Sequence, residues 1–256
     1  MHEVTREQII GCLKQVGITE GDGLLIHSAL QFLGHSSNGA RIYLGAIQEV
    51  IGKSGTIVVP TFNFDFAQTH IYDPAETPSK GMGIFSEFIR QLPEARRTLH
   101  PMQSIASIGR YSDDLTSRDT QSAFDPGSAF ERMLELNFKL LLLGADARAT
   151  SMYHYSEQRA NVPYRYWKDF PGQVKTSRGW ENRTYRMFVR DLEIEPQLTV
   201  DPVVKFLVSY KQWHVAPLNY GKVISCQLTD FVAAVDYFLR SDPWSLVINH
   251  HQEVSK

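Results

Sequence analysis

Four consecutive leucines, Leu140 to Leu143, are the feature that most constrains the fold of this chain. A short, uninterrupted apolar run is typical of a strand that is buried on both faces. Gly144 and Asp146 follow directly, and both residue types favour a turn. The sequence therefore predicts a central strand that delivers the chain to a polar loop.

Similar apolar runs alternate with amphipathic segments through the first 150 residues. Residues 5–16 begin with the capping-box pair Thr5 and Gln8, which predicts a helix. The expected helices lie at residues 5–16, 40–51, 84–92 and 128–136, and the expected strands at residues 24–26, 56–59, 105–109 and 140–143. This alternation predicts a three-layer α/β/α fold with a central sheet.

The alternation of apolar runs and amphipathic segments ends near residue 165. Residues 169–190 carry turn residues and alternating aromatic side chains, so we expect a β-rich antiparallel excursion, inserted or appended, that lies over the site. A last helix is expected from Thr229 to Arg240. Because no repeat or linker is evident, residues 1–256 are expected to form a single domain.

Composition narrows the class of protein. The 256 residues are 43% hydrophobic and carry a net charge of −2, which suits an enzyme and argues against a nucleic-acid binder. The two cysteines, Cys12 and Cys226, have no CxxC spacing and are expected to be reduced core thiols. No apolar run approaches the roughly 20 residues of a membrane span, and the amino terminus lacks a signal peptide, so a cytoplasmic location is expected.

The candidate catalytic residues follow the four leucines. His154 and Glu157 are three residues apart, so on a helix they share a face, and the carboxylate can orient the ring as a general base. Thr150 or Ser151 is expected to cap that helix, and either hydroxyl could serve a developing oxyanion. The alternative is a solvated ion pair with no catalytic role.

Five short motifs in order carry a resemblance to a known family. They are Ile26-His27-Ser28-Ala29-Leu30, Gly55-Thr56-Ile57-Val58-Val59-Pro60-Thr61-Phe62, Arg97-Thr98-Leu99-His100-Pro101 with Ser104, Leu141-Leu142-Leu143-Gly144, and His154-Tyr155-Ser156-Glu157. Together they resemble the aminoglycoside 3-N-acetyltransferase family over nearly the whole chain.

The resemblance implies a three-layer fold with a mixed sheet and the transfer of an acyl group from coenzyme A to a primary amine. It implies His154 as the base and Glu157 as its partner. The family usually has a threonine three residues before the histidine, whereas Ser151 stands there in this chain, next to Thr150. Which hydroxyl serves is therefore open.

The resemblance also implies a set of residues along the acyl-CoA co-substrate, which are His27, Ser28, Ala29, Leu30, Thr61, His100 and Ser104. The alternative for Ser28 and Ser104 is an ordinary capping role, and for His100 a structural role beside Pro101.

For the amine acceptor we expect an amino sugar contacted by Phe64, Tyr164 and Arg165. Basic and aromatic residues interleave from Arg159 to Lys168, which favours a nucleotide-linked amino sugar over a polycationic aminoglycoside. The alternatives are an aminoglycoside acetyltransferase that confers antibiotic resistance, or a solvated basic face.

Two other classes remain as alternatives. A metal-dependent hydrolase would require histidines and carboxylates such as His27, His100 and Glu157 to converge, but no local ligand spacing supports one, so no metal is expected. The second alternative class is a relative that binds acyl-CoA but has no catalytic activity. The expected partners are small molecules, with no nucleic acid or membrane, and a homodimer is left open.

Overall fold

A seven-stranded mixed sheet forms the centre of the molecule, and its strand order is β4-β5-β2-β1-β6-β10-β9. The computed structural model describes residues 3–34 and 38–250. The strands are β1 (Gly23–Ser28), β2 (Thr56–Pro60), β4 (Arg96–Arg97), β5 (Ile105–Gly109), β6 (Lys139–Leu143), β9 (His214–Leu218) and β10 (Gly221–Gln227).

Three central strands run parallel, and the outer strands run antiparallel to their neighbours. β1 pairs in parallel with β2 on one side and β6 on the other, with Ser28 opposite Leu143. The β2·β5, β5·β4, β6·β10 and β10·β9 pairs are antiparallel. The carboxyl ends of β1, β2 and β6 therefore meet at one edge, where open α/β sheets bind ligands.

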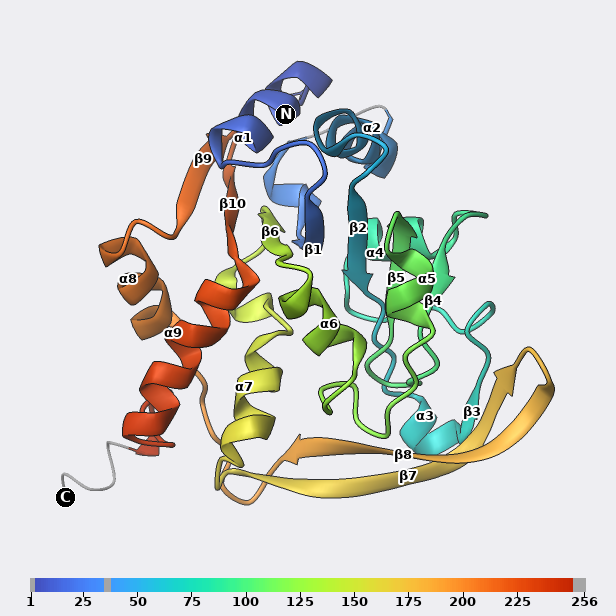
Figure 1. Ribbon diagram of the computed structural model, residues 1–256. Helices are drawn as coiled ribbons and strands as arrows, with labels where there is room; N and C mark the ends of the chain where they lie inside the picture. The colour runs from blue at the N-terminus through green and yellow to red at the C-terminus, as the bar shows by residue number, and fades with distance from the viewer. Residues whose placement is uncertain (1–2, 35–37, 251–256) are drawn as a thin grey trace.

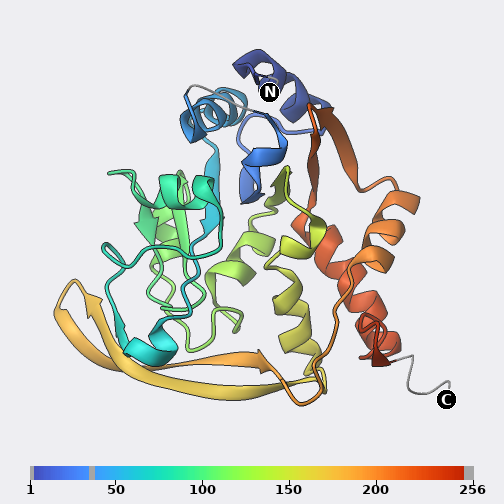
Figure 2. The ribbon, with the colours of Figure 1, turned by 180° about the vertical axis from the view of Figure 1, so that it is seen from behind.

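Helices cover both faces of the sheet, as the figures show from two sides (Figures 1 and 2). One face packs on α1 (Arg6–Gln15), α2 (Ala40–Ile51) and α4 (Ile84–Arg90), and the other packs on α5 (Ser112–Thr116), α6 (Ala129–Glu135), α7 (Tyr153–Ala160), α8 (Asp201–Ser209) and α9 (Leu228–Ser241). Successive leucines of β6 alternate between the two cores, since Leu140 belongs to one and Leu141 to the other. The predicted three-layer α/β/α fold is confirmed.

Local capping explains where two of these helices begin. The hydroxyl of Thr5 accepts the amide of Gln8, and the Gln8 side chain accepts the amide of Thr5, so the predicted capping box is present. Ser128 likewise accepts the amide of Glu131 at the start of α6. These contacts satisfy backbone donors that have no partner inside the helix.

The β-rich excursion is one long hairpin. β7 (Arg165–Thr176) and β8 (Gly179–Arg190) pair over their full length, and β3 (Ile71–Tyr72) adds a third strand. The expected series of turns is therefore wrong, although the antiparallel character is confirmed. The hairpin runs along the lower edge of the molecule, and α3 (Phe66–Thr69) lies on it (Figure 1). A small core that includes Phe66 and Tyr185 fills the space between them.

The helix that carries the candidate catalytic pair begins later than predicted. Its first residue is Tyr153, and the cap position is Met152, whose side chain makes no capping hydrogen bond. Thr150 and Ser151 lie in the turn before α7, so the prediction that either caps the helix is wrong. None of the described helices is both long enough and apolar enough to span a membrane.

Candidate active site

His154 and Glu157 lie one turn apart on α7 and are in direct contact. The Nδ1 atom of His154 is 2.6 Å from Oε2 of Glu157. The Glu157 side chain has no exposed surface, whereas that of His154 is 35% exposed. The carboxylate thus fixes the ring from the buried side and leaves the other edge of the ring accessible, which is the arrangement a general base requires.

Arg165 also contacts this carboxylate. Nη2 of Arg165, at the start of β7, lies 2.9 Å from Oε2 of Glu157, and the arginine side chain is 8% exposed. Burial opposes ionisation of Glu157, but the contacts with His154 and Arg165 prevail and hold its pKa below the ordinary value. Glu157 is therefore an ionised group inside the protein, stabilised by two partners.

The turn before α7 is held by the histidine at the end of β1. Nε2 of His27 lies 3.3 Å from Oγ of Ser151 and 3.4 Å from the Ser151 amide nitrogen. Burial, with a contribution from nearby His154, lowers the pKa of His27 to about 3. His27 is thus neutral, and it accepts hydrogen bonds that position the turn.

The two candidate hydroxyls differ in their surroundings. Ser151 is in contact with His27, whereas Oγ1 of Thr150 is buried and has no hydrogen-bond partner in the described part of the chain. Oγ of Ser28 is also buried and has no hydrogen-bond partner among the described residues. Buried hydroxyls normally have a partner, so these two unpaired atoms are exceptions to that rule.

The segment after β1 packs closely on the turn after β6. The amide of Ala29 donates to the carbonyl of Leu143 at 2.9 Å. A Cβ atom on Gly144, which has φ +70°, would lie only 2.6 Å from the Ala29 carbonyl oxygen, so this approach requires glycine. Leu30 is buried in the adjoining core. Close packing of the two backbones places His27, Ser28 and Ala29 beside the residues that precede His154.

Thr61 and Ser104 belong to a buried network around Arg97. Nε of Arg97 donates to the hydroxyls of Thr61 and Ser104 at 3.0 and 3.1 Å, and those hydroxyls are 3.0 Å apart. Nη2 of Arg97 donates to the Thr61 carbonyl at 2.7 Å. These contacts join β2, β4 and β5 beneath the loop of residues 73–77, with which Arg97 also bonds.

His100 is held by backbone groups on both sides of its ring. Nδ1 accepts the amide of Gln103 at 3.0 Å, and Nε2 is 3.3 Å from the carbonyl of Arg186 on the hairpin. Burial lowers the pKa of His100 to about 4. This geometry matches the structural alternative for His100, since neither ring nitrogen is left for a ligand.

The three residues predicted to bind the acceptor differ in how far they are exposed. Tyr164 has no exposed surface and packs near Trp244, so it cannot stack on a substrate. Arg165 is engaged by Glu157. Phe64 is 50% exposed and lies edge-on to Phe62. The expected acceptor contacts of Tyr164 and Arg165 therefore do not fit their positions.

One pocket is lined by His154, and a second pocket adjoins the first. The first, of about 580 Å³, is lined by Arg148, Thr150, Tyr153, His154, Arg190, Leu192, Glu195, Pro196, Gln197, Leu198 and Val200. The second, of about 710 Å³, shares Arg148 and Val200 with the first. Its other basic and aromatic lining residues are Phe32, Lys205, Trp213, Tyr220 and Lys222. The shared residues make the two pockets neighbours along one stretch of surface.

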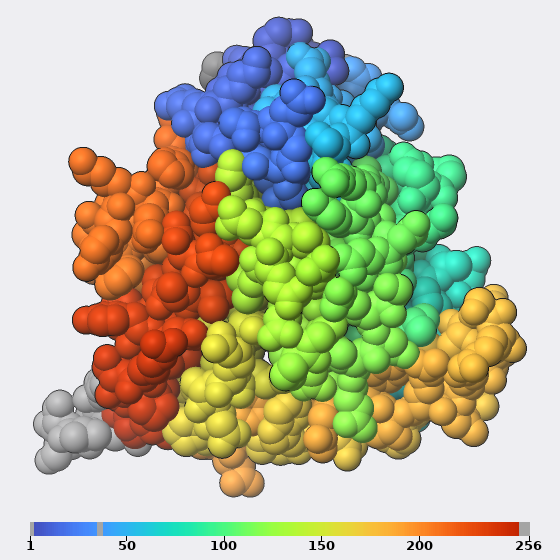
Figure 3. Space-filling model, viewed as in Figure 1, coloured from blue at the N-terminus to red at the C-terminus, as the bar shows by residue number. Residues whose placement is uncertain are grey.

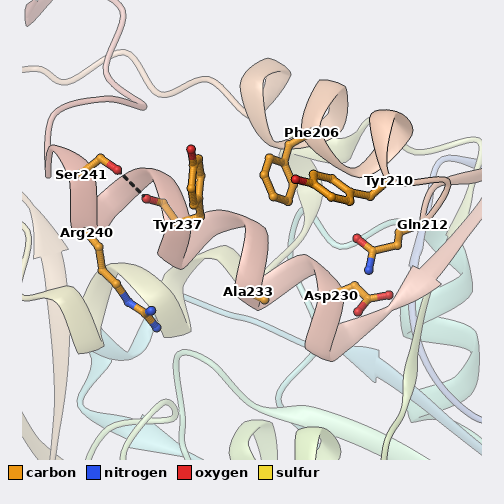
Figure 4. Close-up of a pocket in the computed structure, with 8 residues that line it drawn as sticks. All are labelled: Phe206, Tyr210, Gln212, Asp230, Ala233, Tyr237, Arg240 and Ser241. Carbon is orange, nitrogen blue, oxygen red and sulfur yellow. Dashed lines mark hydrogen bonds between the residues drawn. The ribbon is translucent and has the colours of Figure 1, made fainter.

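A further hollow of about 560 Å³ lies between α8 and α9. It is lined by Phe206, Tyr210, Gln212, Asp230, Ala233, Tyr237, Arg240 and Ser241, which Figure 4 shows as sticks. None of the predicted site residues lines it. Among residues 3–34 and 38–250, no three His, Cys, Asp or Glu side chains are grouped as metal ligands.

The fold and this site together define an α/β protein with a His-Glu pair in direct contact beside a pocket. The comparisons give the family. The model for aminoglycoside 3-N-acetyltransferases matches residues 25–240, so the chain belongs to that family.

Relatives named as aminoglycoside acetyltransferases, or as similar to them, are moderately identical to this chain. Aminoglycoside N(3)-acetyltransferase III of Salmonella sp is 30% identical over 181 residues, which is 64% of this chain and 63% of that protein. The chain thus spans less than two thirds of that relative. The aminoglycoside N(3')-acetyltransferase-like protein YokD of Bacillus subtilis (strain 168) is 25% identical over 91% of this chain and 90% of its own length.

Solved structures have the same fold. AAC-IIIb in a binary complex with CoASH has a TM-score of 0.83 at 20% identity, over 94% of this chain and 97% of that chain. A mutant of aminoglycoside acetyltransferase AAC(3)-IVa in complex with a gentamicin has a TM-score of 0.78 at 22% identity, over 96% and 92% of the two chains.

The sequence did not indicate the surroundings of three arginines, of which two line the pocket at His154. Arg97 stood in one of the family motifs, but nothing assigned it to Thr61 and Ser104. Arg148 and Arg190 line the His154 pocket from η2 (Ala147–Ala149) and the end of β8. Only the folded hairpin brings Arg190 to this pocket, and no local pattern signals that placement.

Proposed function

We propose that the protein is an acyl-CoA-dependent N-acyltransferase that transfers an acetyl or short hydroxyacyl group to the primary amine of an amino sugar. The observation that carries this proposal is the 2.6 Å contact between Nδ1 of His154 and the buried carboxylate of Glu157. When Nδ1–H of His154 donates to the carboxylate of Glu157, the neutral ring keeps the lone pair on Nε2. That lone pair can accept the proton of the attacking amine.

The unpaired buried hydroxyls fit a thioester co-substrate. When bound, acyl-CoA supplies the activated acyl group. Thr150 lines the pocket beside His154 and offers a hydroxyl donor to the oxygen on which negative charge develops. Ser28, with the backbone of Ala29 and Leu30, offers further polar groups at the end of β1. His27 acts through Ser151 by fixing the turn.

The second pocket suits the nucleotide end of coenzyme A. Lys205 and Lys222 provide cations for phosphates, in a lining that also holds Asp201 and the Arg148–Asp146 pair. Trp213 and Tyr220 provide aromatic surface for a base. We leave Thr61, Ser104 and His100 out of the co-substrate site, because the side chains of all three are already bonded within the protein.

For the acceptor we infer a nucleotide-linked amino sugar. Its support is the charge of the pocket at His154, whose described lining residues include Arg190, Arg148, which is paired with Asp146, and one carboxylate, Glu195. A polycationic acceptor would require several carboxylates to replace water around its ammonium groups. An aminoglycoside is the second candidate, because the relatives are named for that activity.

A thiol-release assay tests the proposal and separates the two acceptors. Acetyl-CoA is offered with dTDP- and UDP-linked amino sugars and with kanamycin-type aminoglycosides. We expect turnover with the nucleotide-linked amines to be at least about tenfold faster in kcat/KM, and Arg190→Met to raise KM for them selectively. Equal or greater kcat/KM for the aminoglycosides would favour the second candidate. Absence of thiol release with every amine would overturn the acyltransferase proposal.

A further inference from the structure

The guanidinium of Arg165 contacts both members of the catalytic pair. Nη2 lies 2.9 Å from Oε2 of Glu157 and 3.3 Å from Nδ1 of His154. Nη1 donates to the carbonyl of Phe188 at 3.0 Å. Arg165 therefore ties the carboxylate to the base of the β7·β8 hairpin, which lies along the lower edge of the molecule (Figure 3).

His154 and Arg165 both contact the same carboxylate oxygen of Glu157. Oε2 accepts from His154 and from Arg165, whereas Oε1 is buried without a partner among the described residues. A carboxylate with only one anchored oxygen could rotate about its terminal bond. Two donors on that oxygen, from α7 and from β7, fix its position.

The charges also determine which ring nitrogen carries the proton. An arginine has only donors, so of the two groups beside Nδ1 of His154 only the carboxylate can accept an Nδ1–H bond. Nη2 of Arg165 lies closer to Oε2 of Glu157, at 2.9 Å, than to Nδ1, at 3.3 Å, which leaves Nδ1–H to the carboxylate. The neutral ring consequently presents its Nε2 lone pair to the pocket.

We propose that Arg165 is a positioning residue that keeps Glu157 ionised and in contact with His154, and so selects the Nδ1-protonated form of the ring. This inference rests on the proposed function only for its kinetic consequence. The lowered pKa of Glu157, where the contacts with His154 and Arg165 outweigh burial, agrees with an ionised carboxylate. Arg165 acts through Glu157 and does not contact the substrate.

Kinetics of three variants test this role. Arg165→Met should lower kcat by about 10- to 100-fold with little change in KM, and should move the acidic limb of the kcat/KM profile to higher pH. Arg165→Lys should recover part of kcat, because it keeps the charge. Arg159→Met is the matched control, since Arg159 lies on α7, is half exposed and pairs with Asp236 instead.

Imidazole ¹⁵N chemical shifts give a readout that does not require turnover. In the wild type, the His154 resonances, assigned with His154→Gln, should show a protonated Nδ1 and an unprotonated Nε2 at pH 8. In Arg165→Met the two nitrogens should approach an averaged tautomer. If the wild type transfers no acyl group, the proposed function fails, while this measurement still decides the role of Arg165.

The outcomes separate positioning from other roles. A raised KM with unchanged kcat would overturn the proposal and make Arg165 an acceptor contact. A lower Tm with an unchanged pH profile and unchanged ¹⁵N shifts would also overturn it, since the residue would then be merely structural. Should Arg165→Met not fold, Arg165→Met/Glu157→Gln removes both buried charges, and it should fold while remaining as impaired as Glu157→Gln alone.

Discussion

Oε2 of Glu157 lies 2.6 Å from Nδ1 of His154, and the glutamate side chain is entirely buried while the histidine side chain is 35% exposed. This asymmetry separates two roles, because the buried member orients the ring and the exposed member can meet a substrate. A solvated ion pair would leave both groups in water and would tolerate the loss of either one.

Replacing Glu157 by glutamine should impair both activity and stability. The amide keeps the shape of the side chain but leaves the buried Arg165 without a counter-charge, which typically costs about 3–5 kcal/mol. We expect a smaller loss of kcat than in His154→Ala, since the ring is still present. Urea denaturation together with steady-state kinetics measures both effects, and an unchanged free energy of unfolding would contradict the buried ion pair.

The two hydroxyls before α7 should differ in their contribution to catalysis. Thr150→Val should lower kcat by about 10²-fold or more, in the range of a lost oxyanion donor, because its hydroxyl is unpaired beside His154. Ser151→Ala should have a weaker effect, since the Ser151 hydroxyl contacts His27. The two kcat values measured at saturating substrates decide the matter, and a larger effect at Ser151 would reverse the assignment.

Two buried histidines should make the protein less stable in mild acid. Burial lowers the pKa of His27 to about 3 and that of His100 to about 4. Between pH about 6.5 and pH about 4, His27 and His100 are protonated in the unfolded chain but remain neutral in the folded protein. The free energy of unfolding should therefore fall with decreasing pH by about 1.4 kcal/mol per unit for each histidine.

Urea denaturation from pH 7.5 to pH 5 measures that slope. In His100→Gln the slope should decrease by the contribution of one histidine, whatever the effect on overall stability. A wild-type free energy of unfolding that is independent of pH over this range would contradict the neutral, buried state of both rings.

The Arg97 network should support stability more than catalysis. Arg97→Ala leaves the Thr61 carbonyl and several other acceptors without their donor, and each buried unpaired group costs about 1–3 kcal/mol. We expect a marked loss in Tm and, below that Tm, less than about a tenfold loss of kcat. A large loss of kcat without a change in Tm would place Thr61 and Ser104 in the reaction after all.

Local patterns predicted the layers of the fold, because the helix caps and the leucine run are short-range signals. Thr5 and Ser128 cap their helices as expected, and β6 is buried on both faces. The long hairpin was not predicted as one unit. Its strands pair over 12 residues each, and few of their residues are buried, so the sequence did not show where each strand begins and ends.

The site was predictable only where its residues are neighbours in sequence. The contact of His154 with Glu157 follows from their spacing on a helix. The contact of Arg165 with Glu157 depends on the path of the chain after α7, which brings the start of β7 back to the carboxylate. Burial of Tyr164 has the same origin, and the sequence could not distinguish it from the exposed Tyr166.

The central claim is that His154 removes the proton from the amine without holding the co-substrate. The direct measurement compares His154→Ala with the wild type in kcat for thiol release and in calorimetric binding of CoA. The account predicts a loss of kcat of about 10²–10⁴-fold with CoA affinity nearly unchanged. A variant that kept more than about a tenth of the wild-type kcat would contradict the assignment of His154 as the base.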